Sequence, residues 1–535
     1  MLPAGTPRGQ HSSRRRVAGG QVDEAATSTL RLAEFVVGYS LVSDLGMGQE
    51  LGDAARACLV ATRLAEHLGL PEASEVYYTT LLQHCGCTAF SHEAATFFGG
   101  DDLAAKSAAL RTDYGDPREV LFTYLLGLAP QEGPLVRLRA MGTAVVRSGR
   151  IRAGYTAANC EVAAVTARRV GLGPGVERGL GEIFEQWDGK GLPRGLTGDG
   201  ISVAARCAQV AGTAALFDRL GGTEASVEAV RRRAGRTLDP DLAAGYLRHA
   251  EELHAELAAT DVLPAAVAAE PGPQVQVSED QLDEVCRAFG DAVDLKATWL
   301  HGHSSAVGTL AEAAGRRLGM PAGDVVALRR AGHLQDLGRT AVSTGIWERP
   351  GPLTSADWEQ VRLHAYHTER ILARCPPLAE LAPIAGMHHE RLDGSGYHRA
   401  VAAIPMTARV LGAADTFHAA ISARPHREPL APDAAAELLR GEARAGRLDP
   451  DAVRAVLDVA GHGGGQRRAR PAGLTDRQVE VLRLLAAGLS NPEIARRLVV
   501  SRRTAEHHVQ DIYTRIGRSS RAAAALYAME HGLLD

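Results

Sequence analysis

The sequence has no run of about 18 consecutive apolar residues, the length that a membrane-spanning helix requires. It also has no strong charge bias, because 59 basic and 63 acidic side chains leave a formal net charge of −4. The chain as a whole therefore gives no sign of a membrane partner. Any attraction to nucleic acid must come from one local segment.

Cysteine and lysine are both scarce. The seven cysteines are odd in number and scattered, which excludes a disulfide framework and is typical of the reducing cytoplasm. Only three lysines occur, at positions 106, 190 and 296, so arginine supplies nearly all of the basic charge. A chain of 535 residues is too long for one core and predicts three or four domains.

One segment occurs twice. Residues 387–398 read MHHERLDGSGYH, and residues 183–193, which lie 205 positions earlier in register, read IFEQWDGKGLP. The later copy has two adjacent histidines where the earlier copy has isoleucine and phenylalanine. Other matches follow in the same order: GLP at 69–71 with GMP at 319–321, and RTLDPDL at 236–242 with GRLDPDA at 446–452. The chain is therefore predicted to contain a tandem duplication.

Apolar residues recur at helical spacing through both copies, which predicts an all-α fold. We expect two tandem helical domains and a small four-helix domain, separated by segments rich in proline, glycine and alanine. The expected divisions are a disordered tail at 1–24, a first domain at 25–262, a linker at 263–277, a second domain at 278–460, a linker at 461–472 and a terminal domain at 473–535.

The second copy contains histidine and aspartate residues in a suggestive order. Any one of them alone would be interpreted as an ordinary surface or core residue. Mixtures of imidazole and carboxylate suit iron, manganese, zinc or nickel. A carboxylate between two ions about 3.5–4 Å apart can help to activate water for attack on a phosphoester. The candidate metal ligands are His303, Asp336, His364, His388, His389 and Asp415.

Residues 290–460 resemble the HD-GYP family of metal-dependent phosphohydrolases, whose best-known members cleave cyclic di-GMP. The matching text is HSSAV at 303, HLQDLGR at 333, PGPLT at 350, HAYHTERIL at 364, HHERLDGSGY at 388 and ARVLGAADTFHA at 408. The resemblance implies that a first metal is held by His364, His388, His389 and Asp336. It implies that a second metal is held by His303, Asp336 and Asp415, with Asp336 as the bridge.

The same resemblance implies roles for three arginines. Arg339 would act with Asp336 in the catalytic centre, where the family has a lysine, and Arg424 and Arg427 would bind phosphate. The implied cofactor is a divalent metal such as iron or manganese, as one or two ions. The implied ligand is a nucleotide or another phosphoester.

Three positions depart from the family pattern. Gln335 replaces the histidine of the His-Asp pair, so we expect the first metal site to lose a protein ligand. His333 should not replace it, because two residues along a helix turn a side chain by about 200°. His398 replaces the proline of Gly-Tyr-Pro, and Trp299 stands where three-metal members have glutamate. We therefore expect one intact and one weakened metal site, with neither hydrolysis nor cyclic di-GMP recognition assured.

The first copy keeps none of this ligand set. We interpret it as a metal-free structural copy that supports dimerisation or covers one face of the second copy. A small-molecule sensor built from the vacated cavity is the alternative. The equivalent positions are Asp53, Gln83, His84, Asn159, Ile183, Phe184 and Gly212.

The terminal segment shows the signals of a helix-turn-helix. Ser490 and Glu493 form a capping box with a proline in the first turn, and Ser501 starts a longer helix. Such a second helix enters the major groove of double-stranded DNA. Its expected core residues are Ala505, Val509, Ile512 and Ile516.

This segment resembles the LuxR/GerE-type DNA-binding domain over its whole length. The resemblance implies a four-helix domain that dimerises, often through its last helix, here 519–531. A helical docking module without DNA affinity is the alternative. The candidate DNA contacts are Arg502, Arg503, Glu506, His507, Gln510 and Arg515.

Three functions are compatible with these features. The leading hypothesis is a cytoplasmic, homodimeric transcription regulator whose HD-GYP-like module senses or processes a phosphorylated ligand. The alternative is a metal-dependent phosphohydrolase, or cyclic-dinucleotide phosphodiesterase, with an accessory DNA-binding tail. In the third, the metal or nucleotide is only a ligand that shifts the DNA-binding equilibrium. Because Gln335 damages the HD motif, the sequence does not decide whether the chain is an enzyme.

Overall fold

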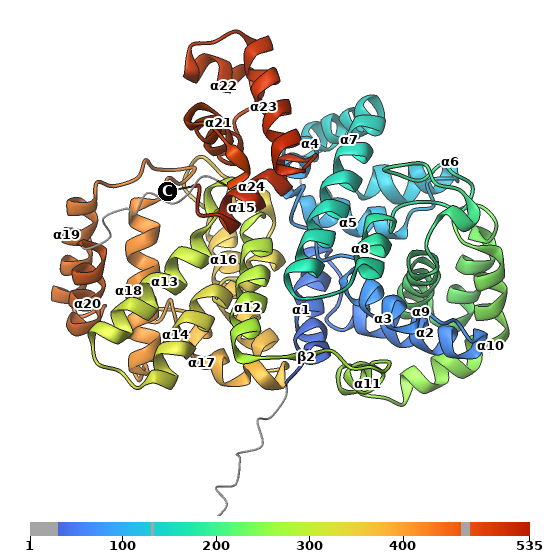
Figure 1. Ribbon diagram of the computed structural model, residues 1–535, viewed down its shortest axis with the longest axis horizontal. Coiled ribbons are helices and arrows are strands. Elements are labelled where there is room, and N and C mark those ends of the chain that lie inside the picture. Colours follow the sequence, from blue (N-terminus) through green and yellow to red (C-terminus); the bar gives the residue numbers. More distant parts are fainter. Residues whose placement is uncertain (1–29, 130–132, 462–470, 535) are drawn as a thin grey trace, which may run out of the picture.

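The computed structural model describes residues 30–129, 133–461 and 471–534. The expected tail at 1–24 and most of the expected linker at 461–472 lie outside these ranges. The described residues are almost entirely helical, which confirms the all-α prediction (Figure 1). In these ranges no helix combines the length and the apolar character needed to cross a membrane.

The first module, residues 30–268, occupies one half of the molecule (Figure 1). Pro134 in the first turn starts its longest helix, and Gly69 in the left-handed conformation ends α2. Its helices are α1 (Leu32–Gly46), α2 (Asp53–Leu68), α3 (Ala73–Leu82), α4 (Ser91–Phe97), α5 (Asp102–Arg111), α6 (Pro117–Glu119), α7 (Pro134–Arg169), α8 (Pro174–Gly181), α9 (Val203–Arg233), α10 (Pro240–Ala258) and α11 (Val262–Ala268).

The second module, residues 276–461, occupies the other half. Ser278 and Gln281 form the capping box that starts its first helix. Its helices are α12 (Glu279–Asp294), α13 (His303–Arg317), α14 (Ala322–Leu334), α15 (Thr344–Trp347), α16 (Ser355–Leu372), α17 (Ala382–Gly386), α18 (Met406–Ile421), α19 (Pro432–Arg444) and α20 (Pro450–Gly461), with 3-10 turns η4 (Thr298–Leu300) and η5 (Leu337–Ala341).

Equivalent residues of the two modules meet each other at the interface between them. Tyr39 of α1 stacks on Phe289 of α12, its counterpart, with 3.9 Å between ring centroids. The Thr88 hydroxyl donates to the carbonyl of Ala292 at 2.5 Å, and the equivalent Thr340 hydroxyl donates to the carbonyl of Val42 at 3.2 Å. The modules are therefore related by an approximate twofold axis, as the subunits of a symmetric dimer are.

The segment expected as a linker at 263–277 is largely folded. Most of it lies in α11, which packs against α2, and in the strand β2 (Gln276–Val277). β2 pairs antiparallel with β1 (Leu30–Arg31), the strand that precedes α1. The prediction of a free linker was wrong because backbone groups that look unstructured in the sequence find hydrogen-bond partners in a distant strand, where Leu30 pairs with Val277 and Arg31 with Gln276.

The terminal domain, residues 471–534, has the four helices that were predicted: α21 (Asp476–Ala486), α22 (Asn491–Leu498), α23 (Arg502–Ile516) and α24 (Arg521–Glu530). The Ser490–Glu493 capping box is present, and Ser501 accepts a hydrogen bond from the Thr504 amide at 3.1 Å. Val499 adopts a left-handed conformation in the turn between α22 and α23.

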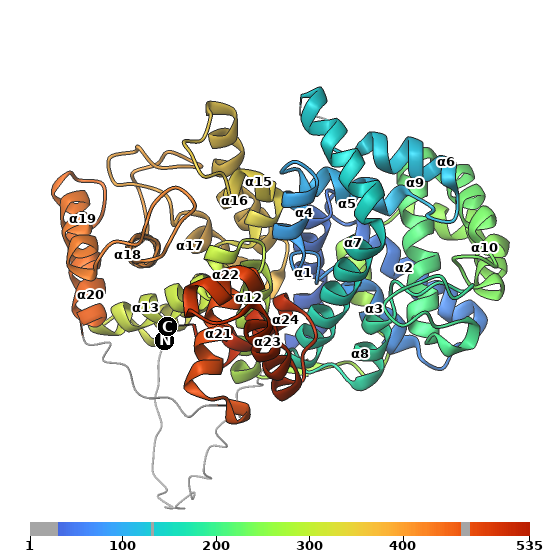
Figure 2. The ribbon, with the colours of Figure 1, turned by 90° about the horizontal axis from the view of Figure 1, so that it is seen from above.

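This domain rests on both modules (Figures 1 and 2). Its last helix, α24, packs against α7 of the first module and also contacts α12. Met529 of α24 accepts a hydrogen bond from the backbone of Gly302 at 2.9 Å. A Cβ added at Gly488 would lie 2.8 Å from the Thr298 side chain, so the two backbones approach closely there.

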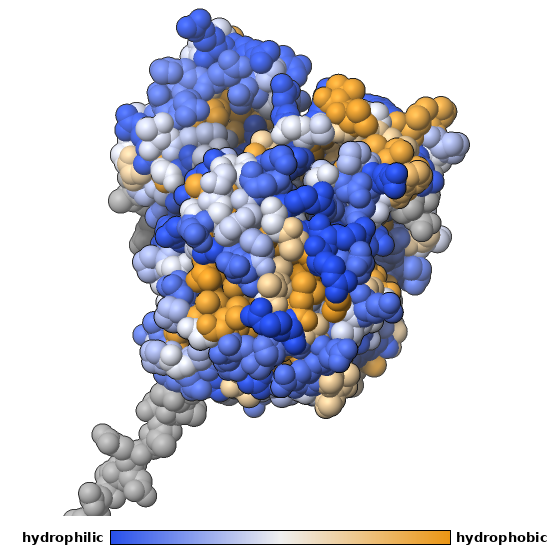
Figure 3. Space-filling view, turned by 90° about the vertical axis from the view of Figure 1, so that its right-hand side faces the viewer, coloured by the Kyte–Doolittle hydropathy of each residue, from blue (hydrophilic) through white to orange (hydrophobic). Residues whose placement is uncertain are grey.

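The first module also presents apolar side chains to solvent. Figure 3 shows them gathered on the face that this module presents, and on α7 they include Leu135, Leu138 and Val146, whose exposed fractions are 82%, 67% and 84%. The predicted homodimer stays a prediction.

Candidate metal centre and DNA-binding domain

Six predicted metal ligands come together in the second module, although they lie on separate elements. His303 is the first residue of α13 and follows Gly302, whose φ of +79° turns the chain into the helix. Asp336 follows α14, and His364 lies in α16. His388 and His389 follow α17, and Asp415 lies in α18.

Their ligand atoms form two adjacent groups: His364 with His388 and His389, and His303 with Asp336 and Asp415, and within each group these atoms lie within 4.8 Å of one another. Oδ1 of Asp336 lies 3.5 Å from Nε2 of His364 and 3.7 Å from Nε2 of His388. Its other oxygen, Oδ2, lies 3.4 Å from Nε2 of His303. Asp336 thus stands between the groups, where a bridging ligand would stand.

The tautomers of two of these histidines are set by backbone carbonyls. Nδ1 of His364 donates to the carbonyl of Val361 at 2.5 Å, and Nδ1 of His388 donates to the carbonyl of Ala385 at 2.6 Å. With Nδ1 protonated, Nε2 carries the free lone pair that a metal ligand needs. Both Nε2 atoms and both oxygens of Asp336 are buried and lack a hydrogen-bond partner in hydrogen-bonding geometry.

Such unsatisfied buried atoms each cost about 1–3 kcal/mol, so four of them in one place require an explanation. A divalent cation would satisfy all four at once. The donor set, neutral imidazole with carboxylate, is the set that iron and manganese accept. The residues present therefore fit a metal centre.

The electrostatics favour the ligating protonation states. Burial lowers the pKa of His364 to about 3 and also lowers the pKa of His388, so both imidazoles are neutral near pH 7. Burial alone would raise the pKa of Asp336, but the positive charge of Arg339 and the nearby His303 imidazole hold it well below its ordinary value. Deprotonated ligands are those that bind metal, so the site needs little proton release to be loaded.

We expected Gln335 to weaken the first metal site, which contains the three histidines. Gln335 instead lies beside the second group. Its side-chain nitrogen donates to Oδ1 of Asp415 at 3.3 Å, beside His303, and its buried oxygen has no partner. The replacement therefore weakens the group of His303, Asp336 and Asp415, and the three-histidine group keeps its set. His333 does not substitute, since it packs against Gly308 of α13.

The two phosphate-binding candidates have different surroundings. The Arg424 guanidinium lies over the Trp299 ring, 4.1 Å from its centroid, and burial lowers its pKa to about 10. The Arg339 guanidinium lies 5.2 Å from the centroid of Trp347 and 2.8 Å from Asp336. Arg427, by contrast, donates to the carbonyls of the last turn of α18 and so caps that helix. Arg424 and Arg339 therefore line the centre.

One residue of the centre was not predicted. Nδ1 of His418 lies 2.8 Å from Nδ1 of His303 and orients that imidazole. His418 comes three residues after Asp415 on α18, so both face the same side of the helix. The three-residue spacing from Asp415 is a signal that could have identified His418. A histidine that only orients another histidine, however, has no sequence motif of its own.

At the equivalent positions of the first module, two of the polar side chains have other partners. Asp53 pairs with Arg219 at 2.9 Å, and the Asn159 amide donates to the carbonyl of Tyr155 at 2.8 Å. Ile183 and Phe184 are apolar and pack near each other. Among the described residues, the candidate metal groups do not include Asp53 or His84.

The terminal domain presents the predicted surface. Ala505, Val509, Ile512 and Ile516 are buried in its core, as expected. Arg502, Arg503, His507, Gln510 and Arg515 are exposed, and Glu506 pairs with Arg502 at 2.7 Å. The exposed side chains at the start of α23 would face a DNA groove.

Residues 287–452 match the family model of the HD domain, and residues 472–528 match that of bacterial regulatory proteins of the luxR family. The chain therefore contains an HD domain followed by a luxR-family DNA-binding domain.

Several characterised proteins are similar to this chain. It is 27% identical over 439 residues to the 3′3′-cGAMP-specific phosphodiesterase 3 of Vibrio cholerae, an alignment that covers 81% of this chain and 95% of that protein. It is 33% identical over 186 residues to a cyclic di-GMP phosphodiesterase of Thermotoga maritima, covering 34% of this chain and 50% of that protein. A crystal structure of a cyclic GMP-AMP-specific phosphodiesterase of V. cholerae shares the fold, with a TM-score of 0.57 and 23% identity over 81% of this chain and 98% of that one.

Proposed function

We propose that the chain is a transcription regulator in which the HD module binds a divalent metal and a nucleotide phosphoester, and so changes the DNA affinity of the terminal domain. The observation that supports this most directly is the position of residues 298–302. This segment contacts the terminal domain through Thr298 and Gly302. It leads straight into His303, a residue of the candidate metal centre.

Ligand binding at the centre would therefore act on the docking surface of the terminal domain. A metal would order His303, and a nucleotide near Trp299 would contact the same segment. Only a ligand with different affinities for the docked and undocked states can shift that equilibrium. The short path between the two sites supplies a physical reason for such a difference.

The site supports a nucleotide ligand by its chemistry. Arg339 and Arg424 bring two positive charges next to the candidate metal ligands, which suits phosphate. Trp299 and Trp347, whose rings lie 6.3 Å apart, offer aromatic faces on which a base can stack. The relatives named above act on cyclic dinucleotides, which agrees with this class of ligand.

DNA binding by the full-length chain tests the proposal. DNA would be selected from a random library, and its affinity measured with and without manganese and cyclic GMP–AMP. We expect a change of tenfold or more. Arg502→Ala with Arg503→Ala should remove binding in both states, because the start of the recognition helix loses its positive charge.

A second variant addresses the docking. Ala525 is buried where α24 meets the first module, in the apolar cluster that includes Phe90 and Ile151. Ala525→Asp should undock the domain and make DNA affinity insensitive to manganese and nucleotide. Ala445→Asp, which adds the same charge at an exposed position, is the control. A ligand response that survives Ala525→Asp would contradict the proposed coupling.

Hydrolysis of a phosphodiester is the second candidate function, favoured by the placement of Asp336 between the two ligand groups. When bound, a divalent metal would polarise the phosphoester and lower the pKa of a water molecule. Gln335 argues for weak activity, because its amide hydrogen bond occupies Asp415. Gln335→His should therefore raise turnover of cyclic GMP–AMP with manganese. Equal turnover in the wild type and the variant would show that Gln335 is not the cause of weak activity.

A further inference from the structure

The first module encloses a cavity of about 290 Å³ where the second module has its candidate metal centre. This volume is close to the lower end of the range for small-molecule sites, about 300–1,000 Å³. Residues at positions equivalent to metal ligands line it, among them Asp53, His84, Ile183 and Phe184. The cavity therefore stands where the ligand set was lost.

Aromatic rings form much of its wall. Tyr155 stands edge-on to Phe184 with centroids 5.6 Å apart and edge-on to Phe90 at 5.9 Å. Tyr114, between α5 and α6, and Tyr124, after α6, also line the cavity, and their ring centroids lie 5.6 Å apart. Ring faces and edges of this kind are surfaces against which a planar aromatic ligand can stack or pack edge-on.

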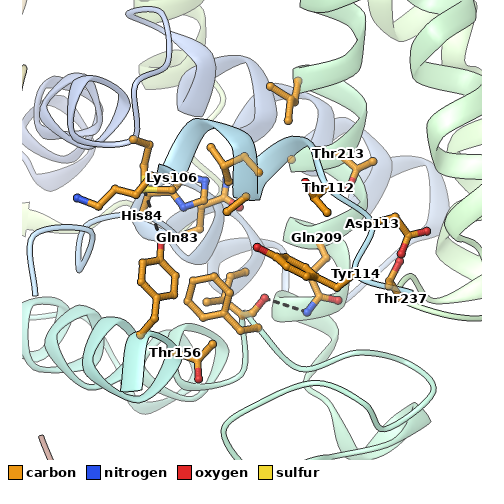
Figure 4. Close-up of a pocket in the computed structure, with 18 of the residues that line it drawn as sticks. Gln83, His84, Lys106, Thr112, Asp113, Tyr114, Thr156, Gln209, Thr213 and Thr237 are labelled. Carbon is orange, nitrogen blue, oxygen red and sulfur yellow. Dashed lines mark hydrogen bonds between the residues drawn. The ribbon is translucent and has the colours of Figure 1, made fainter. Parts of the chain in front are cut away.

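Polar groups point into this aromatic space without partners. Figure 4 shows Gln83, His84 and Thr213 around the cavity. The side chains of Gln83 and His84 form no hydrogen bond within the described part of the chain. Burial lowers the pKa of His84 to about 4, so the imidazole is neutral and can both donate and accept.

Most charged side chains that line the cavity already have an ion-pair partner, and Lys106 shares its partner Asp102 with Lys296. Lys106 pairs with Asp102 at 2.9 Å, and Asp53 pairs with Arg219 at 2.9 Å. Arg233 pairs with Glu119 at 3.1 Å. Arg152 lies over the Tyr114 ring, 5.1 Å from its centroid. Because these side chains already have partners, the two phosphates of a cyclic dinucleotide would have to compete for them, and the cavity favours an uncharged ligand over a cyclic dinucleotide.

The cavity wall continues into the docking surface of the terminal domain. Phe90, Ala94 and Ile151 line the cavity and belong to the apolar cluster that contains Ala525 and Leu526 of α24. Because packed clusters transmit displacement, a ligand that shifts Phe90 also acts on α24.

We propose that the first module binds an uncharged, flat aromatic molecule, held between the aromatic walls and hydrogen-bonded to Gln83 and His84, and that its occupancy changes the docking of α24. This site is separate from the metal centre, so it would be a second input to the same DNA-binding domain.

The uncharged naphthalene dye prodan, which has one carbonyl acceptor, is a suitable probe. With the full-length chain we expect blue-shifted emission that saturates near one equivalent. Thr213→Trp fills the cavity and should abolish saturable binding. Thr309→Trp, which adds the same side chain at an exposed position of α13, should leave it unchanged. Circular dichroism establishes that each variant is folded.

Gln83→Met provides a milder test that keeps the volume. It removes one hydrogen bond of about 0.5–1.5 kcal/mol, so prodan affinity should fall roughly two- to tenfold. Binding that is unaffected by both Thr213→Trp and Gln83→Met would overturn the site. Displacement of prodan by cyclic di-GMP in the wild type, but not in a metal-centre variant such as His388→Ala, would also overturn it, since prodan would then occupy the second module.

Discussion

The two modules share a frame and differ at its centre. In the second module, Asp294 accepts hydrogen bonds from the amide and hydroxyl of Ser304, at 2.8 and 2.7 Å, where α13 begins. In the first, the equivalent Asp44 accepts from the amides of Gly52 and Ala54, at 2.8 and 3.0 Å, where α2 begins. The helix starts are therefore built alike, although one leads to a candidate metal ligand and the other to an ion pair.

The repeated segment shows the same division. Glu390 accepts from the amides of Arg399 and Val401 at 2.7 and 3.1 Å. Glu185 accepts from the equivalent amides of Arg194 and Leu196 at 2.7 and 2.9 Å. The residues that are the same in both copies thus build the loop, and the residues that differ build the candidate metal site of the second module. The loop structure and the metal-binding positions could diverge independently, because they depend on different residues.

The largest expected difference between the modules is in metal binding. Asp336→Asn removes the charge between the two ligand groups and should lower the metal content of the purified chain to near zero. Asp53→Asn, at the position equivalent to His303, should leave it unchanged. Elemental analysis per chain measures both. Equal loss in the two variants would mean that the first module also holds metal.

Loss of the loop-anchoring glutamate should affect both modules alike. Glu390→Ala and Glu185→Ala each remove two hydrogen bonds from backbone amides to a buried carboxylate, which is worth about 3–6 kcal/mol. Urea unfolding should show similar losses for the two. A large loss at Glu390 alone would show that the loop depends on the metal centre and not on this shared anchor.

Acid should weaken the first module through His84. Its pKa in the folded state is about 4, below the ordinary value of 6.5, so the unfolded chain binds the proton first. The contribution of His84 to the free energy of unfolding is therefore fully present above pH 6.5. It falls as the pH drops toward 4, by up to about 3 kcal/mol. His84→Gln should flatten this dependence in urea titrations with the metal chelated. If the variant showed the same dependence of stability on pH as the wild type, another group would be responsible for the acid sensitivity.

The smallest effect concerns the interface between the modules. Thr88→Val removes the hydrogen bond to Ala292, and Thr340→Val removes a hydroxyl that the carbonyls of Val42 and Leu337 share, so each should cost about 1 kcal/mol. The double variant should lose the sum, because the two bonds do not touch. Unequal costs, measured by urea unfolding, would show that the two halves of the interface are not energetically equivalent.

Much of the site could be predicted because its residues have a recognisable order. His303, Asp336, His364 and Asp415 follow one another in that order, and the structure brings them together. The effect of Gln335 was assigned to the wrong metal group, since only the fold decides which carboxylate its amide meets. The role of Arg427 was likewise invisible, because its acceptors are the carbonyls of Ala419 and Ala420 at the end of α18, which the fold of the intervening segment brings within reach.

The sequence by itself determined the helices, the duplication, the candidate ligand set and the helix-turn-helix, because each depends on local spacing or on a recurring motif. Only the tertiary structure decided what fills the first module's centre and where the terminal domain rests. Both depend on packing between residues far apart in the chain, such as the apolar cluster that contains Phe90 and Leu526, and packing of this kind leaves no periodic trace in a sequence.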